Sequence, residues 1–124
     1  MVDTGQAAKD KIKALNEDEK VVFNSSFSDA HFDFISRLAE NQFAMKVEVV
    51  RKMIADIYIA DNFSSQVAGN LDMQVSGVND VHKMKLTLPE SLDEYLTRMS
   101  EENMISKTSV LRQIVQYHYN KMTQ

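Results

Sequence analysis

The residues Lys83-Met84-Lys85-Leu86-Thr87-Leu88-Pro89 carry the clearest structural signal in this chain of 124 residues. Polar and apolar side chains alternate along the stretch, which is the period of a strand with one face buried and the other open. Lys83, Lys85 and Thr87 then share the open face, and the apolar side chains between them point towards a core. The sequence predicts a short β-strand with a basic outer surface.

Two helical patterns follow this strand. Pro89 favours the start of a helix because its φ is fixed, and apolar residues then recur every three or four positions from about Glu90 to Asn103. The hydroxyl of Ser106 can cap a second helix, whose apolar stripe continues to about Lys121. A unit of about forty residues hides too little surface to offset its chain entropy, so it needs a partner of similar size.

The first half of the chain supplies that partner. A shift of 61 positions aligns it with the second half without a gap. The identical pairs are Arg37 and Arg98, Glu40 and Glu101, Lys46 and Lys107, Val49 and Val110, Arg51 and Arg112, and Tyr58 and Tyr119. Similar apolar residues fill many positions between these pairs. The chain therefore reads as a diverged tandem repeat.

The first copy keeps the same plan with different residues. Its strand is predicted from Val21 to Phe27, and Ser28 is a cap for the helix that follows. The outward residues of this strand are Val22, Asn24 and Ser26. Both halves present one strand and two helices, so the expected fold is mainly α with a short antiparallel two-stranded β-ribbon.

The segment from His82 to Lys121 resembles the ribbon-helix-helix (MetJ/Arc/CopG-like) DNA-binding family. The resemblance rests on a strand that ends Leu-Pro, a first helix that opens Pro-Glu-Ser-Leu and closes Ser-Glu-Glu-Asn, and a Ser-Lys-Thr-Ser that opens the second helix. The segment from Val21 to Asp61 shares this resemblance only because it is the first copy of the internal repeat. The resemblance implies a tandem ribbon-helix-helix pseudo-dimer, in which an antiparallel ribbon enters the DNA major groove above four intertwined helices.

The resemblance also implies which residues bind DNA. The base-reading positions fall on Lys83, Lys85 and Thr87 in the second strand and on Val22, Asn24 and Ser26 in the first. Phosphate binding falls on Ser106 and Lys107, at a helix start with free N–H groups. Met45 replaces Ser106 in the first copy and can neither cap a helix nor bond a phosphate. Many family members carry glycine in the loop between the helices, where this chain has Phe43 and Met104.

The net charge of −4 argues against DNA binding, since many nucleic-acid binders are basic overall. The charge is unevenly distributed, however. Residues 82–124 hold six basic and five acidic side chains, a net of +1, whereas the remaining residues hold eight and thirteen, a net of −5. Basic residues on the second strand and at the following helix start still create a local field that favours DNA.

The predicted organisation is an N-terminal arm (1–20), a diverged first repeat (21–61), a linker (62–81) and a second repeat (82–124). Asn62 to Asp80 reads as a linker because glycines stand among serines and asparagines, with a short ordered piece around Leu71 to Val75. The arm is polar and charged, so we expect a loose segment with a helical turn or two around Ala7 to Leu15.

The expected function is sequence-specific binding of double-stranded DNA by a transcriptional regulator, acting as a repressor, with self-association of pseudo-dimers on DNA. One alternative is an accessory DNA-binding protein of plasmid partition or conjugation, which uses the same ribbon. The other is a protein-binding module that has lost DNA contact, which the acidic first half and the apolar Val22 and Met45 suggest.

The remaining expectations concern cofactors and location. No enzyme activity, cofactor or metal is expected, because His31, His82 and His118 stand far apart in the sequence and no catalytic motif occurs. No stretch reaches the roughly 18 to 20 apolar residues of a membrane span, and no signal-peptide pattern occurs. Cysteine is absent, which fits the cytosol. We expect a cytoplasmic, nucleoid-associated protein of a prokaryote, a virus or a plasmid.

Overall fold

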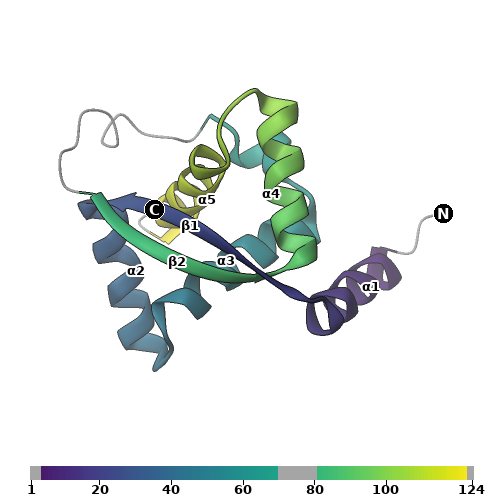
Figure 1. Cartoon of the computed structure of the whole chain (residues 1–124), viewed down its shortest axis with the longest axis horizontal. Coiled ribbons are helices and arrows are strands. Elements are labelled where there is room, and N and C mark those ends of the chain that lie inside the picture. Colours follow the sequence, from purple (N-terminus) through teal and green to yellow (C-terminus); the bar gives the residue numbers. More distant parts are fainter. Residues whose placement is uncertain (1–3, 70–80, 123–124) are drawn as a thin grey trace.

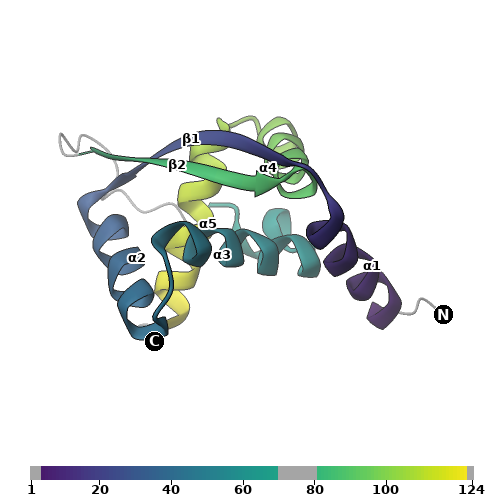
Figure 2. The same ribbon diagram turned by 60° about the horizontal axis from the view of Figure 1, so that its bottom comes forward.

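The structure is a computed structural model that describes residues 4–69 and 81–122 (Figure 1). Its elements are α1 (Thr4–Glu17), β1 (Lys20–Ser28), α2 (Asp29–Gln42), α3 (Lys46–Ala60), the short π-helix η1 (Phe63–Val67), β2 (Val81–Pro89), α4 (Glu90–Asn103) and α5 (Lys107–Met122). The described part is mainly helical with one two-stranded antiparallel sheet, as the sequence predicts. Figure 2 shows this ribbon along one side of the molecule, with α2 and α3 beneath it.

The element boundaries recur at the shift found in the sequence. Adding 61 to the ends of β1 gives the ends of β2, and the same shift converts α2 into α4 and the start of α3 into the start of α5. The predicted helix from Glu90 to Asn103 is confirmed, and the second helix extends one residue beyond the predicted Lys121. We call two residues 61 positions apart equivalent.

The two strands pair along their whole length, from Lys20 opposite Pro89 to Ser28 opposite Val81. One equivalent pair, Asn24 and Lys85, stands directly opposite within this register, so the relation between the strands is centred there. The inward face includes a buried polar residue, Ser25, whose hydroxyl donates a hydrogen bond of 2.8 Å to the carbonyl oxygen of Met84. That bond removes the cost of burying the hydroxyl.

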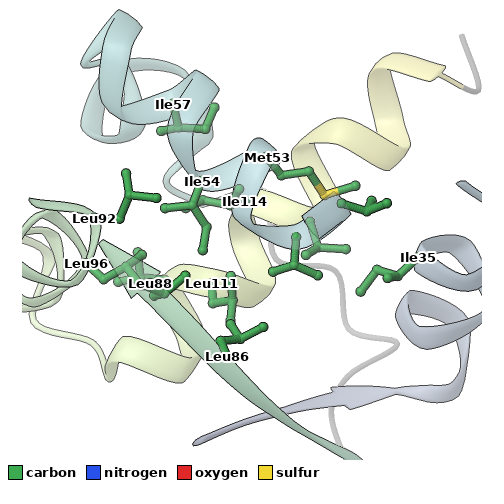
Figure 3. Packing of buried hydrophobic residues seen from close by; sticks show 14 of the residues in the cluster. Ile35, Met53, Ile54, Ile57, Leu86, Leu88, Leu92, Leu96, Leu111 and Ile114 are labelled. Carbon is green, nitrogen blue, oxygen red and sulfur yellow. The ribbon is translucent and has the colours of Figure 1, made fainter. Parts of the chain in front are cut away.

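Both halves contribute to one hydrophobic core beneath the ribbon. The labelled side chains in Figure 3 come from α2, α3, β2, α4 and α5 and point towards one another. They are Ile35, Met53, Ile54, Ile57, Leu86, Leu88, Leu92, Leu96, Leu111 and Ile114, all buried. Because helices of the first half pack on elements of the second, neither half buries its own apolar stripes by itself.

The two loops between paired helices adopt the conformation that glycine usually supplies. Phe43 and Met104 have φ of 52° and 58°, and their backbone N–H groups bond carbonyls of the preceding helix turn. Both side chains are exposed, Phe43 at 98% and Met104 at 90%. The left-handed turn is therefore kept without glycine, at the steric cost that a Cβ imposes there.

The N-terminal residues differ from the loose arm expected from composition. Thr4–Glu17 form α1, which packs against α3 and α4. The ammonium group of Lys11 donates a 2.9 Å hydrogen bond to the carbonyl oxygen of Tyr58, and the carboxylate of Asp18 accepts one of 2.9 Å from the backbone N–H of Ser91. These polar contacts connect α1 to the body, and a sequence pattern does not display them.

The predicted linker contains an ordered element at its start. Phe63 and Val67 of η1 are fully buried, and the N–H of Phe63 donates to the hydroxyl oxygen of Tyr95 at 3.3 Å. Burial of this phenol raises the pKa of Tyr95 to about 12. The ordered piece expected around Leu71 to Val75 lies outside the described residues.

Candidate nucleic-acid interface

All six predicted base-reading residues lie together on the outward face of the ribbon. They form three directly opposed pairs: Val22 with Thr87, Asn24 with Lys85, and Ser26 with Lys83. Five of the six are exposed and Ser26 is partly covered. The alternation of the strands sends their neighbours into the core, so these side chains form a single outer strip.

The centre of this strip is basic. Lys83 and Lys85 are exposed neighbours on β2, and no ion pair among the described residues engages either of them. Asn24 and Ser26 on β1 face these lysines and add amide and hydroxyl groups, which can donate and accept hydrogen bonds. The strip can therefore bind an anionic partner that also offers hydrogen-bond donors and acceptors.

The helix starts beside the ribbon differ as the sequence predicts. The hydroxyl oxygen of Ser106 accepts a 3.0 Å hydrogen bond from the N–H of Ser109, which caps α5. Met45 makes no side-chain bond at the start of α3, and its side chain is exposed. Only the second half thus has a polar cap at this position.

Lys107 is engaged within the chain. Its ammonium group lies 2.5 Å from a carboxylate oxygen of Asp93 and 4.6 Å from the ring centroid of Phe23. The equivalent Lys46 lies instead over the ring of Phe32, at 5.2 Å from its centroid. Phosphate binding by Lys107 stays a prediction, and it would require the lysine to leave or share Asp93.

Two arginines that served only as repeat markers in the sequence hold the outer edges of the ribbon. From α5, Arg112 Nε and Nη2 donate to the carbonyl oxygen and the hydroxyl oxygen of Ser26, at 2.9 Å and 2.7 Å. From α3, Arg51 Nη1 donates to the carbonyl oxygen of Thr87 at 3.3 Å. Ser26 and Thr87 are themselves equivalent, so each half positions the strand of the other by the same contact.

We expect Arg112→Ala to lower the free energy of unfolding by about 1 to 3 kcal/mol, because two charge-assisted hydrogen bonds to the strand are lost. Arg51→Ala is the matched control and should cost less, since its single bond is longer and exposed. Denaturant titration of both variants measures the difference. Equal losses would contradict a specific role of Arg112 at the ribbon.

The ends of the ribbon bring acidic groups close to the strip. The imidazole of His82 stacks on Phe32 at 4.3 Å between ring centroids and bonds the carboxylate of Asp29. At the other end, the neighbouring Glu94, then desolvation and the nearby Asp18 and Glu19, raise the pKa of the exposed Glu90, which is the sign of accumulated negative charge. Acidic side chains therefore lie near both ends of the ribbon, on either side of Lys83 and Lys85.

Across residues 4–69 and 81–122, no group of three histidine, aspartate or glutamate side chains is arranged to hold a metal ion. No helix within the same ranges has both the length and the apolar character needed to cross a membrane. Comparison of the chain with models of known families, with curated proteins and with solved structures found no match in any of the three.

Proposed function

We propose that this chain is a tandem ribbon-helix-helix pseudo-dimer that binds double-stranded DNA in a sequence-specific manner and regulates transcription, as a repressor. The observation that carries the proposal is the outward strip, in which six predicted base-reading residues share one face around Lys83 and Lys85. In this proposal the protein acts in the cytoplasm at the nucleoid, and pseudo-dimers self-associate on DNA.

The pseudo-dimer part of the proposal is supported by the recurrence of element boundaries 61 residues apart. It is also supported by the reciprocal contacts of Arg51 and Arg112, which join equivalent helices to equivalent strand positions. The pairing of Asn24 with Lys85 marks where a local two-fold axis would pass. A symmetric two-chain ribbon would place two identical residues at that point.

The shape of the strip suits DNA better than single-stranded nucleic acid. Two paired strands lie about 4.8 Å apart, and such a ribbon enters a major groove of about 12 Å, where each base pair offers a distinct pattern of donors and acceptors. Lysine suits the O6 and N7 acceptors of guanine, and asparagine suits adenine. The strip has no exposed aromatic ring on which unpaired bases could stack.

A protein-binding role is the rival that an observation favours. Val22 is 55% exposed at one end of the strip, and acidic groups flank the ribbon. These features weaken attraction to phosphate and favour a polypeptide partner. The plasmid partition or conjugation alternative uses the same DNA contact, so only the position of the bound site in a genome separates it from transcriptional regulation.

Selection from random double-stranded oligonucleotides tests the proposal. Because Asn24 faces Lys85 and Ser26 faces Lys83, the two halves of one subsite should differ, with more guanine beneath β2. A perfect palindrome within the footprint of one molecule would contradict the asymmetric ribbon. Absence of any enriched sequence would reject DNA recognition and favour the protein-binding role.

A further inference from the structure

The segment after α3 fills a groove between α4 and α5. Phe63 and Val67, four positions apart in η1, are fully buried there. The teal part of Figure 1 shows this segment beside α4. Residues at a spacing of four lie on the same side of a helical turn, so both side chains enter the groove together.

Polar contacts fix the segment in this groove. Asn103 Nδ2 donates to the hydroxyl of Ser64 at 3.3 Å, the hydroxyl of Tyr117 donates to Gln66 Oε1 at 3.4 Å, and the N–H of Gly69 donates to Gln113 Oε1 at 2.9 Å. The hydroxyl of Ser64 also lies 3.6 Å from the sulfur of Met99. Residues of both α4 and α5 therefore contact the segment from Ser64 to Gly69.

Within residues 4–69 and 81–122, no segment fills the equivalent groove of the first half. It has a volume of about 160 Å³ and lies between α2, α3 and the end of α5. The lining residues are Leu38, Gln42, Val49, Lys52, Met53, Asp56, His118 and Met122. Leu38, Gln42, Lys52 and Asp56 are the equivalents of Met99, Asn103, Gln113 and Tyr117, four of the residues that contact the segment from Phe63 to Gly69.

The open groove differs from the filled one in charge. Lys52 stands at the position equivalent to the acceptor Gln113. The group of an occupant that contacts Lys52 should therefore be a hydrogen-bond acceptor or an anion, and not an N–H. Asp56 replaces the donor Tyr117, so it should meet a donor, and it already lies 4.0 Å from His118 Nε2. The apolar floor from Leu38, Val49 and Met53 is retained.

We propose that this groove is a docking site for a short segment of a partner protein. The contacts of η1 give its chemistry: an aromatic residue at the first position, a basic residue at the fourth to meet Asp56, an aliphatic residue at the fifth and an acidic residue at the seventh to meet Lys52. These positions correspond to Phe63, Gln66, Val67 and Gly69 of the filled groove.

A second copy of the chain does not offer its η1 segment, because Phe63 and Val67 are buried in their own groove. The occupant that we propose is therefore a segment of a different polypeptide, and insertion of another segment of a second copy is tested separately below. Figure 2 shows the ends of α2 and α5 on the side away from the ribbon, so the docked segment leaves the outward strip free. A partner could therefore be held while the ribbon is engaged.

The probe is a synthetic blocked peptide Phe-Ser-Ser-Lys-Val-Ala-Glu, which is the sequence of residues 63–69 with lysine in place of Gln66 and glutamate in place of Gly69. When this peptide is titrated into the intact chain, the methyl NMR signals of Leu38, Val49 and Met53 should shift. For so short an apolar segment we expect a dissociation constant on the order of 0.1 to 1 mM. No shift at these methyls, or shifts centred on another surface, would overturn the proposal.

Charge exchange tests the chemistry of the partner. Lys52→Glu should weaken binding of this peptide roughly three- to tenfold, and a peptide ending in Lys should recover the affinity. Lys52 is exposed, so the fold is preserved, and Lys13→Glu on α1 is the control for a change of net charge. Equal binding of both peptides by both proteins would overturn the charge assignment.

Sedimentation of the peptide-free chain tests whether a second copy of the chain occupies the groove. Phe43 stands next to the groove residue Gln42 and is 98% exposed, so a second copy could insert this ring instead. Dimerisation that Phe43→Ser abolishes, together with loss of peptide binding in the dimer, would assign the groove to self-association and overturn the partner proposal. A chain that stays monomeric at the NMR concentration supports the proposal.

Discussion

Replacing Lys85 by alanine is expected to weaken binding to the preferred DNA site by about 1 to 3 kcal/mol, or roughly 5- to 150-fold. Lys85 is exposed, stands at the centre of the ribbon opposite Asn24, and has no ion-pair partner among the described residues. Its ammonium group is thus available to a base edge. The loss should be smaller on random DNA, which offers only phosphate contacts.

Electrophoretic mobility shift or fluorescence anisotropy at fixed salt measures both affinities. Lys13→Ala is the matched control, since it removes the same charge from the exposed side of α1 and leaves the ribbon unchanged. The unfolding transition of Lys85→Ala should match that of the unaltered chain, because the side chain points away from the core. If specific and random DNA lose equal affinity, Lys85 is a backbone contact and reads no base.

A chain shortened to residues 1–69 is expected to lose its cooperative fold entirely. β1 pairs with β2, and the described residues provide no other strand for it. The helix α3 loses α5, against which it packs, and Phe63 and Val67 of η1 lose the groove that covers them. So few remaining apolar contacts cannot offset the entropy of ordering the chain.

Circular dichroism and denaturant titration at low concentration measure this loss. The control is to add the complementary piece, residues 80–124, in equal amount: the mixture should regain helical signal and a cooperative transition, because strand pairing and the shared core are restored. A shortened chain that unfolds cooperatively as a monomer would show that the first half has a sufficient core of its own.

The second half of the fold could be predicted closely because its local signals agree. Pro89 and the apolar spacing after it place α4, the Ser106 hydroxyl caps α5, and the alternation from Lys83 places β2. The ends of β1 were harder to predict, because the polar Ser25 interrupts the alternation of polar and apolar residues. The structure begins it at Lys20, one residue before the prediction, and Ser25 is satisfied across the ribbon.

Elements held by contacts distant in sequence could not be predicted from patterns. The helix α1 was expected only as a turn or two, because its attachment uses Lys11 and Asp18, which bond partners 47 and 73 positions away. The η1 turn was read as linker, because serines and a glycine surround Phe63 and Val67. Their spacing of four is the signal that could have indicated burial.

For the candidate site, alternation was sufficient to place six residues on one face, since a strand has only two faces. It could not show that Lys107 pairs with Asp93 or that Arg112 reaches Ser26. Both contacts depend on how α5 lies against the rest of the chain. Charge counts along the sequence likewise could not show that acidic groups gather at the ends of the ribbon.

The pairing of β1 with β2 within one chain has a consequence for the concentration at which the protein works. A ribbon made from two separate chains obeys mass action, so dilution dissociates it and removes the folded state. Here the two strands stay at a fixed effective concentration set by the segment between them. A few molecules in a cell would retain an intact ribbon, and the fraction folded would not change as the protein is diluted.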